Sequence, residues 1–428
     1  MMNAPDFPGK KVCVLGLGIS GEASAFFLAA KGFEVWVSDA GASRPVLERL
    51  AKLRAVGIQG EAGTHSYDRI FGSDWAVISP GIPPFAPVMQ EGRKRGLPIF
   101  SEIEVASRFF DARRVLAVTG TCGKTTLTTL LARMLNAGGY PAIACGNIGN
   151  PWIGELDTLG ARGIAVLELS SFQLEHCYRL KPAIGILLNI SPNHEDWHED
   201  NAAYVRAKLR LFQAQTAGDH ALIRRIDQQA LFPGYRFNGA VSYFGADPDA
   251  NPQAEVLAQT ASILGLPAQA AAQTLQQFEG IEHRLEVFLK EDGIAYVNDS
   301  KSTTTAALIW ALKKYPDRSV VLIAGGHPKS RDFDQAREWV ARKVRLAVLV
   351  GEARELLREA WQGTCPLYES SDFQDAVRAA RAAAQSGDTV LLSPACASFD
   401  MFKNYEERGR IFKTLIRGAS SKPSSTHV

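Results

Sequence analysis

The residues with the clearest chemistry lie at positions 118–126, which read Val-Thr-Gly-Thr-Cys-Gly-Lys-Thr-Thr. Gly120 and Gly123 let the backbone bend so that successive N–H groups point at phosphate oxygens. Lys124 supplies a positive charge for the outer phosphates, and the hydroxyl of Thr125 is a suitable Mg²⁺ ligand. The segment therefore predicts a polyphosphate-binding loop, and hence ATP binding.

The elements around this loop favour the same interpretation. A strand-like run at 114–118 precedes it, and an apolar, helix-like run at 127–135 follows it, so a helix N-terminus adds its dipole to the site. The spacing is shorter than in the common P-loop, because Val118 stands where a glycine is usual. The alternative is a glycine-rich turn with a solvated lysine. It is disfavoured because strand, loop, Lys-Thr pair and helix coincide.

A second glycine pattern lies near the N-terminus. Gly16, Gly18 and Gly21 follow a buried strand, and Asp39 ends the next strand. This is the dinucleotide fingerprint, which read literally predicts an NAD-dependent oxidoreductase. Physically it predicts a tight turn that offers N–H groups to a diphosphate, with a carboxylate nearby. A nucleotide-sugar diphosphate fits that geometry as well as NAD does.

Further polar residues follow strands of the segment that carries the P-loop. Glu168 ends a buried strand and is a natural Mg²⁺ ligand beside a Lys-Thr loop. His194 follows another strand and is a metal ligand, a proton handler or a structural histidine; the pattern does not decide between these. Asp196 and His198 are equally well explained as solvated loop residues. On pattern alone, Lys208 is an ordinary helix lysine.

Strands and helices alternate along nearly the whole chain, which predicts an α/β protein with parallel sheets. We expect a Rossmann-like N-terminal domain over residues 1–110 and a P-loop ATPase-like α/β domain over 111–280. A second Rossmann-like domain is expected over 281–417, beginning with a β-hairpin that turns at 291–293. The polar tail 418–428 is expected to be disordered.

Composition excludes several classes of protein. The chain has 428 residues, 46% of them hydrophobic, and a formal charge of +2, which is too balanced for a nucleic-acid-binding protein. No apolar run reaches the length of a membrane span, and the N-terminus lacks the pattern of a signal peptide. The six cysteines are scattered without metal-site spacing. We therefore expect a cytoplasmic enzyme with reduced thiols.

Three further stretches, taken with the P-loop, resemble a known family. Residues 168–173 read Glu-Leu-Ser-Ser-Phe-Gln, residues 298–303 read Asn-Asp-Ser-Lys-Ser-Thr, and residues 393–400 read Ser-Pro-Ala-Cys-Ala-Ser-Phe-Asp. Over about residues 10–417 the chain resembles the Mur ligases, ATP-dependent amide-forming enzymes of peptidoglycan synthesis. The resemblance implies an enzyme that adds D-glutamate to UDP-N-acetylmuramoyl-L-alanine through an acyl phosphate, and a monomer is expected.

The resemblance also implies three groups of binding residues. The UDP-sugar site comprises Gly16, Gly18, Ile19, Ser20, Asp39, Ser79, Gly81, Asn147, Ser170 and Gln173. The ATP site comprises Gly120, Thr121, Cys122, Gly123, Lys124, Thr125, Thr126, Arg284, Asp299 and Lys301. The D-glutamate site comprises Thr303, Lys329, Ser398 and Tyr405.

For the chemistry, the resemblance implies catalysis by Lys124, His194, Lys208 and Arg284. Two Mg²⁺ ions are implied, with metal ligands Thr125, Glu168, His194 and Lys208, the last as a carbamate derived from CO₂. The chain departs from the family pattern at Cys122, where asparagine is usual, and at Asn193, where aspartate is usual. The family's adenine-contacting motif is not recognisable, and Asn251 is the candidate that remains.

Three alternatives stay open from the sequence. A dehydrogenase would use the first glycine pattern but would leave the P-loop unexplained. A non-enzymatic nucleotide-binding regulator would need no polar clusters on three sheets. The third alternative is another ligase of the superfamily, either a neighbouring Mur ligase or one like folylpolyglutamate synthetase.

Overall fold

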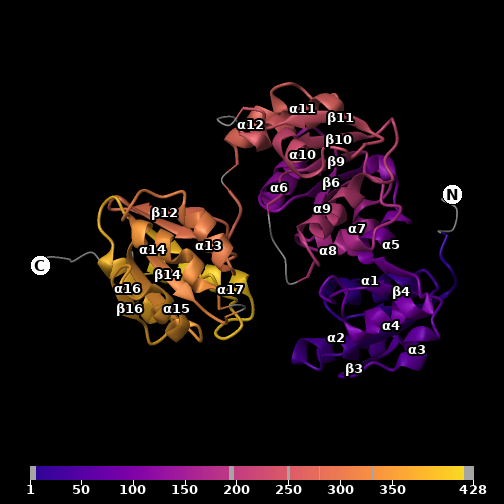
Figure 1. Ribbon diagram of the computed structural model, residues 1–428, viewed down its shortest axis with the longest axis horizontal. Coiled ribbons are helices and arrows are strands. Elements are labelled where there is room, and N and C mark those ends of the chain that lie inside the picture. The colour runs from indigo at the N-terminus through magenta and orange to yellow at the C-terminus, as the bar shows by residue number, and fades with distance from the viewer. Residues whose placement is uncertain (1–5, 192–196, 248–250, 279, 329–330, 419–428) are drawn as a thin grey trace, which may run out of the picture. The chain divides into compact units, whose positions relative to one another are not determined.

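The computed structural model describes residues 6–191, 197–247, 251–278, 280–328 and 331–418. The chain divides into two compact units, residues 1–278 and 279–428. The first unit carries two sheets and the second carries one (Figure 1). No helix in the described part of the chain is long and apolar enough to cross a membrane. The predicted disordered tail lies outside the described residues from position 419 onward.

The first sheet is parallel throughout and has the strand order β3-β2-β1-β4-β5. Its strands are β1 (Lys11–Leu15), β2 (Glu34–Asp39), β3 (Gln59–Ala62), β4 (Trp75–Ile78) and β5 (Ile99–Ser101). Its helices are α1 (Ile19–Ala30), α2 (Arg44–Ala55), α3 (Tyr67–Phe71), α4 (Pro87–Arg95) and α5 (Glu102–Ser107). The predicted doubly wound sheet is confirmed. Its order reverses between β1 and β4, where such sheets place ligands at the carboxyl ends of the strands.

The second sheet is also parallel, with the order β11-β10-β9-β6-β8-β7. Its strands are β6 (Val115–Thr119), β7 (Ala142–Gly146), β8 (Ile164–Glu168), β9 (Ile184–Leu187), β10 (His220–Arg224) and β11 (Ala240–Phe244). Its helices are η1 (Ala112–Arg114), α6 (Lys124–Ala137), α7 (Trp152–Leu159), α8 (Ser171–Glu175), α9 (Asn201–Leu209), η2 (Arg210–Phe212), α10 (Arg225–Leu231), α11 (Pro252–Ile263) and α12 (Ala270–Gln276). Because β6 lies between β9 and β8, the P-loop emerges at the centre of the sheet.

The third sheet, in the second unit, has the order β12-β13-β17-β14-β15-β16. Its strands are β12 (Glu286–Glu291), β13 (Ile294–Asn298), β14 (Val320–Gly325), β15 (Val344–Val350), β16 (Leu367–Glu369) and β17 (Thr389–Leu392). Its helices are α13 (Thr305–Leu312), η3 (Phe333–Ala336), α14 (Arg337–Lys343), α15 (Arg354–Trp361), α16 (Phe373–Ala383) and α17 (Tyr405–Gly418). The predicted hairpin is confirmed: β12 and β13 are antiparallel, and Asp292 and Gly293 both have positive φ.

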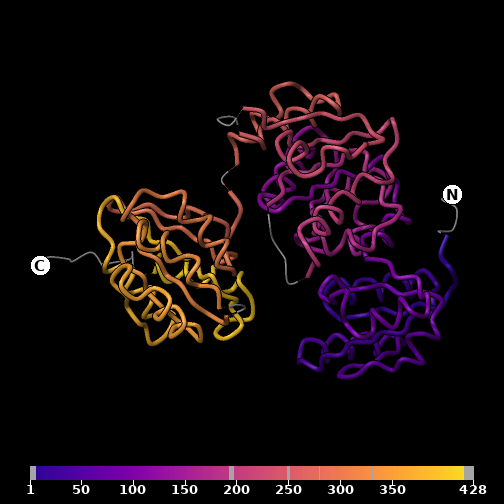
Figure 2. The backbone as a smooth tube through the Cα atoms, viewed as in Figure 1, coloured from indigo at the N-terminus to yellow at the C-terminus, as the bar shows by residue number. Residues whose placement is uncertain are grey.

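The two sheets of the first unit share one apolar core. A single cluster of buried side chains includes Val14 of β1, Trp75 of β4, Leu167 of β8 and Trp152 of α7. The tube in Figure 2 follows the chain from the first sheet into the second without a detached linker. Burial of apolar surface common to both sheets explains why they form one compact unit.

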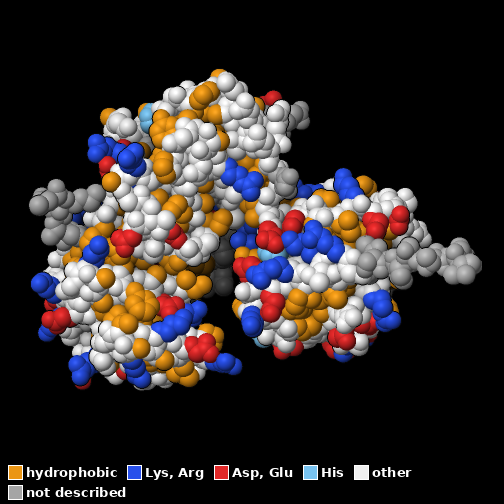
Figure 3. All heavy atoms as spheres, turned by 180° about the vertical axis from the view of Figure 1, so that it is seen from behind, with side chains coloured by type: hydrophobic (Ala, Val, Ile, Leu, Met, Phe, Trp, Pro, Cys, Tyr) orange, Lys and Arg blue, Asp and Glu red, His pale blue; other side chains and the backbone are white. Residues whose placement is uncertain are grey.

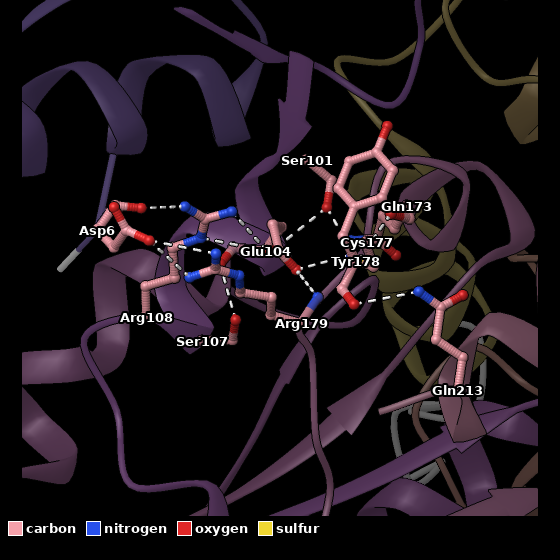
Figure 4. A network of polar contacts seen from close by, with 10 residues as sticks. All are labelled: Asp6, Ser101, Glu104, Ser107, Arg108, Gln173, Cys177, Tyr178, Arg179 and Gln213. Atoms are coloured by element: carbon pink, nitrogen blue, oxygen red, sulfur yellow. Dashed lines mark hydrogen bonds and ion pairs between the residues drawn. The ribbon is translucent and has the colours of Figure 1, made fainter. Parts of the chain in front are cut away.

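A buried polar network reinforces this junction (Figure 4). The carboxylate of Glu104, on α5, is fully buried and accepts hydrogen bonds from the backbone N–H groups of Tyr178 and Arg179, both at 2.9 Å. It also pairs with Arg108, whose Nη2 lies 2.9 Å from Oε1. Ser101, at the end of β5, contacts Cys177 with Oγ and Sγ 3.1 Å apart. These bonds fix the first sheet against the segment that follows α8.

Charged side chains of both signs occur together on one face of the molecule. On the face shown in Figure 3, lysines and arginines are interspersed with aspartates and glutamates. This mixture of charges agrees with the near-neutral net charge of the chain.

Candidate active site

The P-loop joins β6 to α6 through two glycines that no other residue could easily replace. Gly120 has a φ of +151° and Gly123 a φ of +79°. A side chain on Gly120 would meet the backbone of Asn189 at 3.2 Å. The first turn of α6 begins at Lys124, where backbone N–H groups lack a carbonyl partner within the helix and suit a phosphate. Nζ of Lys124 donates to the carbonyl oxygens of Gly120 at 2.9 Å and Thr121 at 3.0 Å, so it closes the loop.

The loop differs from the prediction in one respect. The N–H groups of Thr121 and Cys122 donate to the side-chain oxygen of Asn189, at 3.1 and 2.8 Å, instead of pointing outward. The amide of Asn189 also donates to the carbonyl of Cys122 at 2.9 Å. Asn189 therefore holds the loop in shape, and the N–H groups of Thr121 and Cys122 are occupied by its side chain. The sequence signal for this residue was its position just after β9, next to the strand that carries the loop.

Glu168, at the end of β8, has the environment of a cation ligand. It is buried, and its Oε1 accepts a hydrogen bond from Nδ2 of Asn147 at 3.0 Å. Its Oε2 is buried without a hydrogen-bond partner in the described structure. A buried carboxylate oxygen left unpaired is costly, and a cation would satisfy it. With Thr125 buried on the neighbouring P-loop helix, these residues fit a Mg²⁺ ion beside the phosphates.

Lys208, on α9, is buried under the P-loop, with 1% of its surface exposed. Its Nζ donates to the carbonyl oxygen of Gly120 at 2.9 Å and lies 4.5 Å from the ring centroid of Tyr204. Burial, with a smaller effect from the charge of Lys124, holds the pKa of Lys208 well below its usual value. The structure thus corrects the pattern-based interpretation of Lys208 as an ordinary helix lysine.

Two side-chain contacts attach α9 and the residues just before it to the P-loop and to α8. The hydroxyl of Tyr204 lies 3.0 Å from Oγ1 of Thr121. His198 is buried, and its Nε2 lies 3.0 Å from Oγ of Ser171. The interpretation of His198 as a solvated loop residue is therefore wrong, because its side chain is buried against Ser171 of α8.

Ser170 and Gln173 have a structural role that the sequence prediction did not include. Ser170 caps α8 by accepting from the backbone N–H of Gln173 at 3.2 Å, and Oε1 of Gln173 accepts from the N–H of Ser170 at 3.0 Å. This reciprocal capping box fixes the start of α8. Gln173 also lines a cleft with Ser79 and Pro80 of the first sheet. The two residues thus position the junction where the predicted sugar-binding residues lie.

The first glycine pattern forms a tight turn between β1 and α1. Gly16 has a φ of +86°, and a side chain on Gly21 would lie 2.0 Å from the carbonyl oxygen of Gly16. Asp39 accepts from the N–H of Leu17 at 2.5 Å and from that of Gly41 at 2.7 Å. Space around Gly18 is open, since no atom lies within 4 Å of a Cβ built there. The turn therefore has an open side at Gly18, and diphosphate binding there stays a prediction.

Other residues predicted for the UDP-sugar site lie at the same edge of the first sheet, at the carboxyl ends of β1 and β4. Oγ of Ser79, after β4, donates to the carbonyl oxygen of Gly16 at 2.8 Å. Ile19 is 60% exposed at the start of α1, with Ser20 beside it, and Gly81 has open space around it. These residues therefore lie at the switch point of the sheet.

In the second unit, predicted binding residues follow the carboxyl ends of two strands. Asp299 and Lys301 follow β13, and Ser398 follows β17. Asp299 is buried, and its carboxylate accepts from Oγ of Ser393 at 2.9 Å and from the N–H of Leu285 at 3.1 Å. Burial raises the pKa of Asp299 to about 7. Nζ of Lys301 lies 5.4 Å from the ring centroid of Tyr405. Asp299 thus lies at the carboxyl ends of β13 and β17, and Lys301, two residues further on, lies near Tyr405.

Arg408, on α17, is a residue that the sequence interpretation missed. It is buried, and its guanidinium donates to Oγ of Ser300 at 3.0 Å and to the carbonyl oxygens of Ser300, Cys396 and Ala397 at 2.8 to 3.1 Å. Burial lowers the pKa of Arg408 to about 10. Arg408 therefore holds the loop of Lys301 and Thr303 against the loop of Ser398. In the sequence it appeared only as one charged residue of a terminal helix.

Some predicted residues cannot be placed with the rest. His194 and Lys329 lie outside the described residues, as do Asn193 and Asp196. Arg284 belongs to the second unit, in a turn where His283 and Leu285 have positive φ. Asn251 caps α11 by accepting from the N–H of Gln253 at 3.0 Å. Gln253, two residues further on, lies beside the P-loop, since its Nε2 would be 3.3 Å from a Cβ on Gly123.

Family models match three consecutive parts of the chain. They describe a MurD-like N-terminal domain of Mur ligases at residues 10–101, a Mur ligase middle domain at 118–265, and a glutamate ligase domain of Mur ligases at 283–396.

Curated relatives match over the full length. The chain is 36% identical to the UDP-N-acetylmuramoylalanine–D-glutamate ligase of Chloroherpeton thalassium, covering 97% of this chain and 99% of the relative. It is 37% identical to the ligase of that name from Chlorobaculum parvum, covering 98% and 100%. Among solved structures, the fold is similar to UDP-N-acetylmuramate-alanine ligase MurC of Thermotoga maritima, with a TM-score of 0.57, 18% identity and coverage of 96% and 100%. It is also similar to MurF ligase of Thermotoga maritima in complex with ADP, with a TM-score of 0.58, 14% identity and coverage of 90% and 96%.

Proposed function

The chain belongs to the Mur ligase family, and we propose that it is the ATP-dependent ligase that joins D-glutamate to UDP-N-acetylmuramoyl-L-alanine. The observation that carries the proposal is the likeness to D-glutamate ligases at 36–37% identity over 97–98% of the chain. The reaction would supply a peptidoglycan precursor in the cytoplasm, by a monomeric enzyme of three domains with the boundaries predicted above.

In the first step, the carboxylate of the L-alanyl group attacks the γ-phosphorus of ATP, and the products are an acyl phosphate and ADP. This transfer depends on positioning and on offsetting negative charge. Lys124 supplies a cation at the start of α6, where helix N–H groups also face the phosphates, and Arg284 supplies a second cation. Bound Mg²⁺ would neutralise charge on the phosphates, and Thr125 and Glu168 would hold it, with His194 as a further ligand.

Lys208 would act as a carbamate in this site. A neutral amine reacts with CO₂ to give a carbamate and one proton, and the low pKa of Lys208 favours the neutral amine. The carbamate nitrogen keeps one N–H, which can still donate to the carbonyl oxygen of Gly120. The new anionic oxygens are the hard ligands that Mg²⁺ prefers, whereas a bare ammonium would repel the ion.

In the second step, the amine of D-glutamate attacks the acyl phosphate, forming the amide and releasing phosphate. The two carboxylates of D-glutamate need cationic and hydroxyl partners, and Thr303, Lys329, Ser398 and Tyr405 are proposed for this role. His194 would orient the amine or accept its proton. Water must be excluded from the acyl phosphate, because hydrolysis would compete with attack by the amine.

The test is phosphate release from ATP with UDP-N-acetylmuramoyl-L-alanine and a panel of D- and L-amino acids. Turnover that requires both the UDP-sugar and D-glutamate supports the proposal. Turnover with another amino acid would indicate a neighbouring Mur ligase, and turnover with a folate acceptor would indicate a folylpolyglutamate synthetase-like enzyme. Thermal stabilisation by NAD but not by the UDP-sugar would favour the dehydrogenase.

A further inference from the structure

A hydrogen-bonded cluster that the proposed mechanism does not use lies beside the first glycine turn. Oγ of Ser38 donates to Oε1 of Glu61 at 2.7 Å and lies 2.7 Å from Nδ1 of His65. Glu61 also accepts from the backbone N–H of Ser66 at 2.7 Å, as expected for a carboxylate. A hydroxyl has only one proton, and the Glu61 carboxylate takes it. The proton between Ser38 and His65 must therefore be on Nδ1, which donates to Ser38.

This assignment leaves the other ring nitrogen of His65 as an acceptor. His65 is half-buried, and burial lowers its pKa, so the ring is neutral near pH 7. In a neutral imidazole with the proton on Nδ1, Nε2 carries a lone pair. Within the described part of the chain, no group makes a hydrogen bond with Nε2 of His65. The cluster thus presents one oriented acceptor whose partner must come from solvent or a ligand.

His65 lies at the edge of the first sheet where the nucleotide is predicted to bind. Asp39 pairs with Ala62 in the sheet, and the N–H of Gly63 donates to the carbonyl oxygen of Asp39 at 2.9 Å. The N–H of Gly16 donates to the carbonyl oxygen of Ser38 at 2.9 Å. In such sheets the diphosphate binds at the turn after β1, and the carboxylate after β2 lies beside the ribose. The strands run β1, β2, β3 toward the edge of the sheet. His65 follows β3, so we expect it beyond the ribose, on the side of the base.

We propose that Nε2 of His65 accepts a hydrogen bond from the nucleoside of the UDP-sugar, from a base N–H or a ribose O–H, and so helps to select the nucleotide. The inference rests on the proposed function, because it assumes that this edge binds UDP. Ser38 and Glu61 position the ring, and neither needs to touch the ligand. A bond of this kind between neutral groups changes affinity by about three- to tenfold.

Two substitutions separate this role from a merely structural one. In His65→Asn, the amide nitrogen takes the place of Nδ1 and can still donate to Ser38, but nothing occupies the place of Nε2. In His65→Gln, the terminal amide reaches the place of Nε2 and can present its oxygen, but the bond to Ser38 is lost. We expect His65→Asn to bind UDP about three- to tenfold more weakly by calorimetry, and His65→Gln to stay within about twofold of wild type.

The KM for the UDP-sugar should rise in His65→Asn and stay near the wild-type value in His65→Gln. The kcat should not change in either variant, because the γ-phosphate binds elsewhere. The reverse order, or an equal loss in both variants, would overturn the acceptor role and leave His65 as a structural residue. Unchanged binding in His65→Asn would also overturn it. If the wild-type protein fails to bind UDP, the proposed function itself is refuted. If the wild type binds UDP and His65→Asn binds it equally well, only this inference is refuted.

Discussion

The buried carboxylate of Glu104 gives the sharpest prediction about how the first unit is held together. Glu104→Gln keeps the size of the side chain but removes its charge. The amide oxygen can still accept from the N–H groups of Tyr178 and Arg179. The amide nitrogen then faces the guanidinium of Arg108, whose side chain is 9% exposed, so two donors meet and a buried cation loses its partner.

The expected magnitude follows from these contacts. Leaving one partner of a buried ion pair without the other costs about 3 to 5 kcal/mol. We take about 3 kcal/mol here, because the guanidinium keeps a bond to the carbonyl of Asp6 and lies 4.3 Å from the ring centroid of Phe100. At about 2 to 4 °C per kcal/mol, the melting temperature of the first unit should fall by about 6 to 12 °C.

Calorimetric unfolding of the full chain measures this shift. The control is Glu91→Gln, which also breaks a glutamate–arginine pair in a helix of the first unit, but at the surface. This variant should melt close to wild type, because solvent screens the pair. Adding Arg108→Met to Glu104→Gln removes the unpaired cation and should recover part of the loss. If Glu104→Gln melts within about 1 °C of wild type, the argument that this network joins the two sheets is wrong.

Three further outcomes are expected. Lys124→Ala should reduce ligation by at least about 100-fold in a phosphate-release assay without changing the circular dichroism spectrum, because its ammonium offsets charge on the transferred phosphoryl group; retention of a tenth of the wild-type rate would contradict this. Lys208→Ala should lose most activity and regain part of it with formate, whereas Lys208→Arg should stay inactive, since guanidinium cannot carry CO₂; an active Lys208→Arg would exclude the carbamate. The pKa of Asp299 is raised to about 7 in the folded state, so the native protein holds a proton that the unfolded chain has released, and stability falls as pH rises toward 7. Asp299→Asn should therefore gain about 3 kcal/mol over wild type in urea unfolding between pH 5 and pH 8, and parallel pH profiles would refute the assignment.

Much of the fold and of the site could be predicted from the chain alone. The P-loop, the first glycine turn and the hairpin at Asp292-Gly293 depend on short-range geometry, because glycine supplies positive φ where other residues are strained. The alternation of buried strands and amphipathic helices predicted parallel sheets, and parallel strands bring their carboxyl ends to one edge. Hence the sequence predicts that Glu168 and the P-loop lie together at one sheet edge.

Other features depended on contacts between segments far apart in the sequence. Asn189 occupies two N–H groups of the P-loop from 67 and 68 residues away, and Arg408 joins two loops of the second unit. The pattern gave Lys208 as an ordinary helix lysine and His198 as a residue equally well explained by a solvated loop, because local patterns carry no information on burial by a distant strand or helix. The tautomer of His65 likewise depends on Ser38 and Glu61, which are neighbours only in the sheet. The sequence by itself determined the local phosphate-binding turns and the sheet edges, whereas tertiary packing decided which side chains are desolvated, and desolvation sets their charge and chemistry.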